Sequence, residues 1–340
     1  MSEQARSPAM TYAGDQAIVV VGVDGSERNQ AAIEYAVASA LALHRPLLLV
    51  SVVSFDPAEP HRAESGPDRQ WTLLEDIRDR LVEEHPRLRA STSVRFGHPV
   101  SSLASIVGER DLLVVGKRGM GPSRAMRIGS TAIRLAAVAP SLLAVVPPRW
   151  QAPAGHPGPV VVGVDSAWDN EKTLRLAFLQ ALRTGAPLCV VSATDLRPAL
   201  VWDRARGEPA YRQWERRSAA ALAEMIGPLR GQFPDVEVTV AHDQGHAADV
   251  LTAQARTPQL IVLARRDHRG ESTGLGSVAR EVLDVAAAPV LVVPVVETAE
   301  SDQPVAVSEP GWPQVTTPGD RRIPGDLPHD GREGPTARRR

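Results

Sequence analysis

Short apolar runs separate longer amphipathic segments along most of the chain. The first run, Ile18–Val23, is continuous rather than alternating, which is typical of a strand buried on both faces of a sheet. An amphipathic segment then begins near Ser26, a residue that can cap a helix, and continues to about His44. A second apolar run, Leu47–Val53, predicts the next strand. This alternation favours parallel strands with right-handed helical crossovers, that is, a doubly wound α/β sheet.

The same alternation continues to about residue 147 and is then repeated. We expect further first-half strands at 89–95, 112–115 and 142–146, and helices at 68–85, 99–109 and 130–138. The opening strand VVVGVDGS at 19–26 recurs as VVVGVDSA at 160–167, with Asp24 and Asp165 offset by 141 residues. The second half predicts strands at 160–164, 188–191, 236–240, 260–263 and 290–293, with helices clearest at 171–183 and 211–229. A period of one domain length indicates a tandem repeat of domains.

These patterns predict two tandem domains, each with a five-stranded parallel sheet flanked by helices. We expect a disordered N-terminus at 1–16, domain 1 at 17–147, a linker at 148–158, domain 2 at 159–296, and a disordered tail rich in proline and charge at 297–340. The apolar edge strands Leu142–Val146 and Val290–Val293 need covering. Within one chain they could cover each other as an intrachain pseudo-dimer, and a homodimer of whole chains is a further alternative.

Composition narrows the class of protein. The net charge is −2, which gives no reason to expect nucleic acid or a membrane surface as a partner. The single cysteine, Cys189, lies in an apolar run and is expected to be buried, and no cysteine-rich metal site can form. Since neither a signal-peptide pattern nor a long apolar span is found, we expect a soluble cytoplasmic protein.

One loop has the pattern of an anion-binding site. After the fourth strand, Gly116 is followed by two residues, Gly119, nine residues, Gly129, and then Ser130 and Thr131. Glycines let backbone N–H groups approach a phosphate, and a helix start favours an anion. The spacing matches neither a P-loop nor the dinucleotide-binding turn. Taken alone, a glycine-rich surface loop with helix capping explains it equally well.

Asp24 adds weight to the binding interpretation. Strands one and four of a doubly wound sheet are usually neighbours, so Asp24 would face the same crevice as the loop. Its carboxylate could accept hydrogen bonds from ribose hydroxyls, or it could form a turn beside Gly25 and Ser26. The two roles are compatible.

With these residues in place, the chain resembles the nucleotide-binding branch of the universal stress protein family, strongly over 17–147 and more loosely over 159–296. The resemblance implies bound ATP, with Mg²⁺ or Mn²⁺ held through the phosphates, and dimerisation through the last strand. It implies these contacts in domain 1: Asp24 and Gly116 at the ribose, Gly22, Val23 and Val52 at the adenine, Gly119, Gly129, Ser130 and Thr131 at the phosphates, with Arg118 and Arg127 nearby.

Domain 2 departs from this pattern. Asp165, Gly276 and Ser277 are kept, but Ala264 replaces the first glycine of the loop and Asp267 replaces the second. A carboxylate there would repel phosphate, although neighbouring arginines could compensate. We therefore expect ATP mainly in domain 1, with domain 2 acting as its pseudo-dimer partner.

Three classes of function remain open. The first is an ATP-binding regulatory protein of stress physiology, where the word stress comes from the resemblance alone. The second is a slow ATPase or autophosphorylating enzyme, although residues 116–131 contain no carboxylate or histidine to position water. The third is a protein-interaction module that does not use nucleotide and binds an unknown protein partner. No catalytic residue and no protein-held metal is expected.

Overall fold

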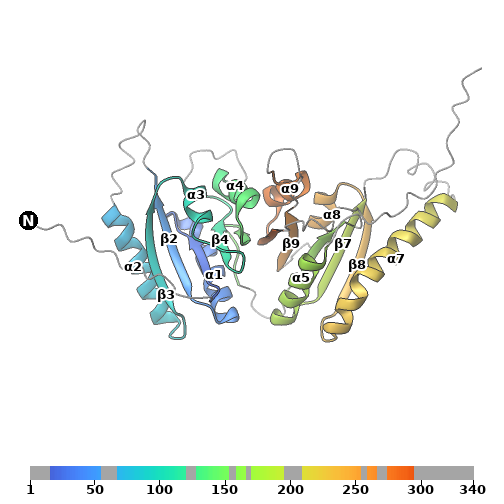
Figure 1. Cartoon of the computed structure of the whole chain (residues 1–340), viewed down its shortest axis with the longest axis horizontal. Helices are drawn as coiled ribbons and strands as arrows, with labels where there is room; N and C mark the ends of the chain where they lie inside the picture. Colours follow the sequence, from blue (N-terminus) through green and yellow to red (C-terminus); the bar gives the residue numbers. More distant parts are fainter. Residues whose placement is uncertain are drawn as a thin grey trace, which may run out of the picture.

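The computed structural model describes residues 16–54, 67–119, 128–152, 158–165, 170–194, 209–253, 259–265 and 274–294. Within these ranges each half of the chain forms a five-stranded parallel sheet, and the halves stand next to each other in Figure 1. The predicted α/β fold class is therefore confirmed. No helix in the described ranges is long and apolar enough to cross a membrane.

Domain 1 has its strands in the order β3-β2-β1-β4-β5. Its elements are β1 Val19–Gly22, the 3-10 turn η1 Glu27–Asn29, α1 Gln30–Leu43, β2 Leu47–Val53, α2 Pro67–Glu84, β3 Ala90–Phe96, α3 Pro99–Ala104, β4 Leu112–Gly116, α4 Ser130–Val138 and β5 Leu142–Val146. Since β1 lies between β2 and β4, chain order reverses beside its carboxyl end. Such a point is where ligands bind in doubly wound sheets.

Domain 2 repeats this arrangement in the order β10-β9-β6-β7-β8. Its elements are β6 Val160–Val164, α5 Glu171–Thr184, β7 Leu188–Thr194, α7 Pro209–Gln232, β8 Val238–Gln244, α8 Ala247–Ala253, β9 Leu260–Arg265, α9 Ser277–Val285 and β10 Val290–Pro294. Cys189 is buried on β7, as expected.

The two sheets join through their last strands. β5 and β10 pair antiparallel, with Val145 opposite Val290 and Leu143 opposite Val292. The result is one ten-stranded sheet. This pairing confirms that the two apolar edges cover each other within one chain.

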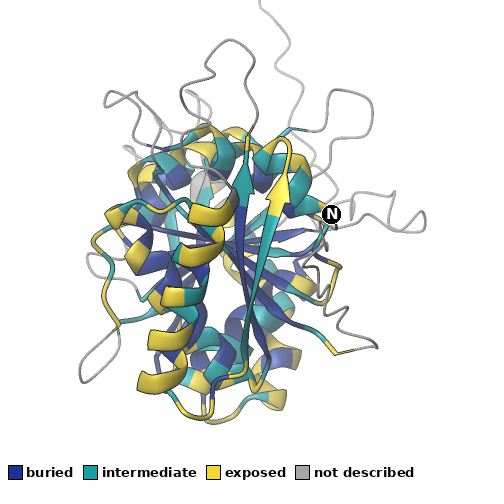
Figure 2. Cartoon of the chain, turned by 90° about the vertical axis from the view of Figure 1, so that its left-hand side faces the viewer, coloured by how far each residue is buried: buried dark blue, intermediate teal, exposed yellow. Residues whose placement is uncertain are grey.

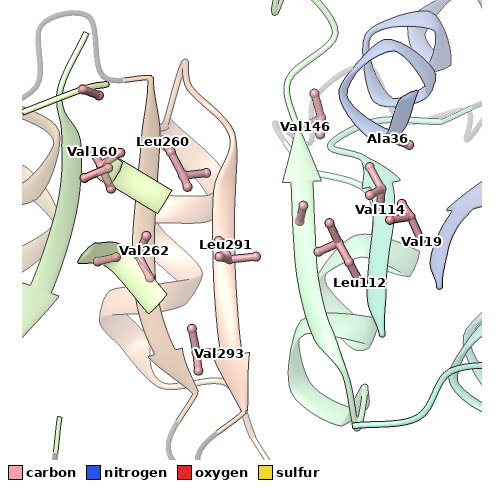
Figure 3. Close-up of a cluster of buried hydrophobic side chains, with 14 of the residues drawn as sticks. Val19, Ala36, Leu112, Val114, Val146, Val160, Leu260, Val262, Leu291 and Val293 are labelled. Carbon is pink, nitrogen blue, oxygen red and sulfur yellow. The ribbon is translucent and has the colours of Figure 1, made fainter. Parts of the chain in front are cut away.

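Alternate residues of each buried strand pack on opposite faces of the sheet. Val19 and Val21 face one core cluster, beneath α1, whereas Val20 faces the other, beneath α3 and α4. Figure 2 shows the buried strands inside helices whose outer faces are exposed, and Figure 3 shows part of the first cluster. Each buried valine or leucine stabilises the fold by about 1.5–3 kcal/mol, so a strand buried on both faces needs a continuous apolar run.

Two local predictions were wrong. Ser26 precedes the turn η1 rather than α1, and its side chain makes no capping hydrogen bond. Its hydroxyl donates instead to Asp24 Oδ1 at 2.8 Å. The helix α3 ends at Ala104 rather than near residue 109. A turn replaces its predicted end, since the Gly108 N–H donates to Asp111 Oδ2 at 2.8 Å.

The junction strand offers a test of how the domains depend on each other. Leu291 lies opposite Ala144 and is 6% exposed, so Leu291→Asp places a carboxylate in the shared apolar layer. We expect it to lower the free energy of unfolding by about 3 kcal/mol or more. The control Phe96→Asp, at a side chain that is 68% exposed, should change it little. Urea unfolding measures both, and equal stability of Leu291→Asp and the native chain would contradict the pairing.

Candidate functional site

The candidate site lies at the carboxyl ends of β1 and β4. These strands are adjacent and parallel, with Val19 opposite Leu112 and Val21 opposite Val114. This register brings the turn after β1, with Asp24, to the same sheet edge as the loop that starts at Gly116. The sequence prediction that these two segments meet is therefore confirmed.

Asp24 forms the turn that follows β1. Its Oδ1 accepts from the Ser26 N–H at 2.9 Å and from the Ser26 hydroxyl at 2.8 Å. Gly25 has φ +77°, a left-handed conformation that suits glycine. The turn role proposed for Asp24 is thus present. It uses one carboxylate oxygen, while the other, Oδ2, lies against the loop after β4.

The glycines of the loop are required by close approach. A Cβ on Gly119 would clash with Oδ2 of Asp24, and a Cβ on Gly116 would lie 3.2 Å from the Arg118 carbonyl oxygen. The absence of a side chain at Gly119 therefore lets the loop backbone approach the Asp24 carboxylate. The absence of one at Gly116 lets the loop fold back so that the Arg118 carbonyl lies close to it. This is the geometry in which backbone N–H groups come within reach of a ligand.

The loop also sets the start of α4. The Gly129 N–H donates to the Lys117 carbonyl at 2.8 Å, and Gly129 is the N-cap residue of α4 without any side-chain cap. The first regular bond of this helix runs from the Ile133 N–H to the Gly129 carbonyl at 3.2 Å. The N–H groups of Ser130 and Thr131 thus precede the hydrogen-bonded ladder, where a helix favours an anion.

The remaining predicted residues surround this cradle. β1 ends at Gly22, and the N–H of the next residue, Val23, donates to the Val50 carbonyl at 2.7 Å. Val52 is half-buried near the end of β2, two residues past the partner of Gly22. Arg118 is half-buried in the loop itself. Arg127 lies outside the described residues.

Sequence reasoning missed Asn29. This side chain is 4% exposed, and its Nδ2 donates to the Gly22 carbonyl at 3.0 Å. A Cβ on Gly116 would lie 3.5 Å from the same nitrogen, so Asn29 sits between β1 and the loop. Its Oδ1 is buried and has no hydrogen-bond partner in the described ranges.

A repeated spacing could have revealed this asparagine. Asn29 follows Asp24 by five residues (29 − 24), and Asn170 follows Asp165 by five (170 − 165). In domain 2 the Asn170 Nδ2 donates to the Asp165 carbonyl at 2.7 Å. In both domains the asparagine at this position therefore donates to a backbone carbonyl at the end of the first strand or directly after it.

Domain 2 keeps a cavity of ≈ 220 Å³ at the corresponding place. Its lining is largely apolar and includes the residues that match the domain 1 site: Gly163, Val164, Asp165, Asn170, Ala193, Ala264, Gly276 and Ser277. The structure thus brings together Asp165, Gly276 and Ser277 as predicted. Asp267 lies outside the described residues. No group of three or more potential metal ligands occurs among the described side chains.

Comparison with known proteins identifies the family. The model of the universal stress protein family matches residues 17–147 and 158–294. A universal stress protein of Mycolicibacterium smegmatis is 29% identical over 81% of this chain and 96% of its own length. One from Mycobacterium tuberculosis is 30% identical over 81% of this chain and 94% of its own length. The chain therefore belongs to the universal stress protein family.

A solved structure agrees with this fold. The crystal structure of a universal stress protein from Archaeoglobus fulgidus superposes with a TM-score of 0.59 at 15% identity, covering 82% of this chain and 97% of that one. The likeness therefore extends over both domains, and at this identity it concerns the fold alone.

Asn29 can be tested through stability. Asn29→Leu removes the donor to the buried Gly22 carbonyl, and we expect the free energy of unfolding to fall by about 1–2 kcal/mol. The neighbouring Gln30→Ala, at an exposed side chain, is the control and should change it by less than about 0.5 kcal/mol. Denaturant titration compares the two, and an unchanged midpoint for Asn29→Leu would show that this hydrogen bond does not stabilise the fold.

Proposed function

We propose that this universal stress protein is a regulatory ATP-binding protein that holds the nucleotide in domain 1. The observation that carries the proposal is the approach of Gly119 to Asp24, next to the uncapped start of α4. A side chain on Gly119 would fill the cradle, and the helix start offers N–H groups to an anion.

In this proposal different residues of domain 1 contact the ribose, the adenine and the phosphates of ATP. Oδ2 of Asp24 and the backbone at Gly116 receive the ribose, and the strand ends at Val23 and Val52 border the adenine. Gly119, Gly129, Ser130 and Thr131 hold the phosphates, with Arg118 and Arg127 as cationic neighbours. Mg²⁺ would arrive with the phosphates, because it keeps several waters and is usually bound through one or two carboxylates and the nucleotide.

Domain 2 serves in this proposal as the structural partner of domain 1. Ala264 and Asp267 replace the two glycines that form the cradle in domain 1. Asp267 would place a negative charge in the loop, which opposes a triphosphate. The cavity that remains is lined mainly by apolar side chains.

We propose regulation rather than hydrolysis as the role of the bound ATP. Hydrolysis needs a group that positions or deprotonates water near the γ-phosphate. Residues 116–131 offer lysine, arginine, serine and threonine but no carboxylate or histidine.

Gly129→Asp tests the proposed site. The new carboxylate would stand at the start of α4 and repel the phosphates, so ATP affinity should fall by a factor of about 100 or more. The control is Gly227→Asp, which makes the same change at an exposed glycine of α7 with nothing within 4 Å of its Cβ position. Isothermal titration with Mg-ATP measures both variants. Equal affinity in Gly129→Asp and the native protein would refute the site.

A further inference from the structure

Two cationic side chains cross the junction between the domains. The Lys117 Nζ donates to the carbonyls of Asp284 at 2.8 Å and Ala286 at 2.9 Å, at the end of α9. The Arg265 Nη1 donates to the Ala139 carbonyl at 2.7 Å, at the end of α4. Lys117 is 8% exposed and Arg265 is 9% exposed. Both charges are therefore buried at the junction and bonded to backbone of the opposite domain.

The two contacts are equivalent within the tandem repeat. Lys117 directly follows β4 and Arg265 ends β9, the equivalent strand, while Ala139 and Ala286 are the C-cap residues of α4 and α9. Each cation therefore meets the negative end of a helix dipole, which stabilises it. A buried cation without hydrogen-bond acceptors would destabilise the fold. Each cation therefore depends on the helix-end carbonyls that accept its hydrogen bonds.

These contacts connect the proposed ATP site of domain 1 with the corresponding cavity of domain 2. The Lys117 carbonyl accepts from the N-cap residue of α4 at the domain 1 site, while its side chain holds the end of α9, which starts at the domain 2 cavity. Arg265 holds the other end of α4. Since α4 and α9 each have nine residues, a displaced C-terminal end shifts the start of the same helix.

We propose that Lys117 and Arg265 are positioning residues that make the site of each domain depend on the other domain. Arg265, although it belongs to domain 2, fixes the helix whose start binds phosphate in domain 1, and Lys117 does the same in reverse for α9. This inference rests on the proposed ATP site for its ligand. The claim that Arg265 fixes α4 and that Lys117 fixes α9 does not depend on bound ATP.

Arg265→Met and Lys117→Met test the proposal in the full-length chain. Titration with Mg-ATP should show affinity about fivefold weaker for Arg265→Met, a change of the size typical of coupling between sites, because Arg265 holds α4 of domain 1. The effect of Lys117→Met falls on α9 of domain 2 and is measured by hydrogen exchange. Arg265→Lys keeps a cationic donor and should restore most of the affinity. The matched control is Lys172→Met, because the Lys172 Nζ also donates to a carbonyl, that of Pro294 at 2.7 Å, but within domain 2. Native affinity is expected for this control.

Hydrogen exchange supplies a readout that needs no nucleotide. Arg265→Met should speed exchange of the α4 amides in domain 1 and leave α2 unchanged, whereas Lys117→Met should speed exchange in α9. Native-like exchange of α4 in Arg265→Met would overturn the proposal, as would equal loss of ATP affinity in Lys172→Met. If the native protein binds no ATP, the proposed function fails, and the exchange of α4 alone then decides whether the domains are coupled.

Discussion

The antiparallel pairing of β5 with β10 is the constraint on which the rest of this structure depends. Each domain alone would leave an apolar edge strand with unpaired backbone groups, which is a route to aggregation. Pairing closes both edges and makes one continuous sheet. It also sets how far Lys117 and Arg265 must reach, so their contacts with the opposite helices follow from the register of these two strands.

A second constraint shapes the site, and it is steric. Oδ2 of Asp24 lies where a side chain on Gly119 would stand, so the turn after β1 and the loop after β4 fit only as a pair. In domain 2 the matching positions are Asp165 and Asp267, two carboxylates in place of a carboxylate and a glycine. Both domains thus have the same fold, whereas the proposed phosphate-binding site belongs to domain 1.

The sequence predicted the apolar strands well, because strands buried on both faces need unbroken apolar runs, and Leu47–Val53 and Leu142–Val146 end where these runs end. The more polar strand predicted at 236–240 lies instead at Val238–Gln244. Ser26 was assigned wrongly because the 3-10 turn η1 separates it from α1, whose N-cap residue is Asn29. The contacts of Lys117 with Asp284 and Ala286, which lie 167 and 169 positions further along the chain, could not be predicted. They depend on the register between the two domains, which no local pattern contains.

The nucleotide content of freshly purified protein is the measurement to make first, by acid release and chromatography. We expect about one ATP per chain, since domain 1 alone keeps the glycine cradle at a helix start. About two per chain would contradict the asymmetry between the domains, because the alanine and aspartate in domain 2 would then be tolerated. If no nucleotide is released and added Mg-ATP does not bind, the assignment of this protein as a nucleotide-binding regulator is wrong.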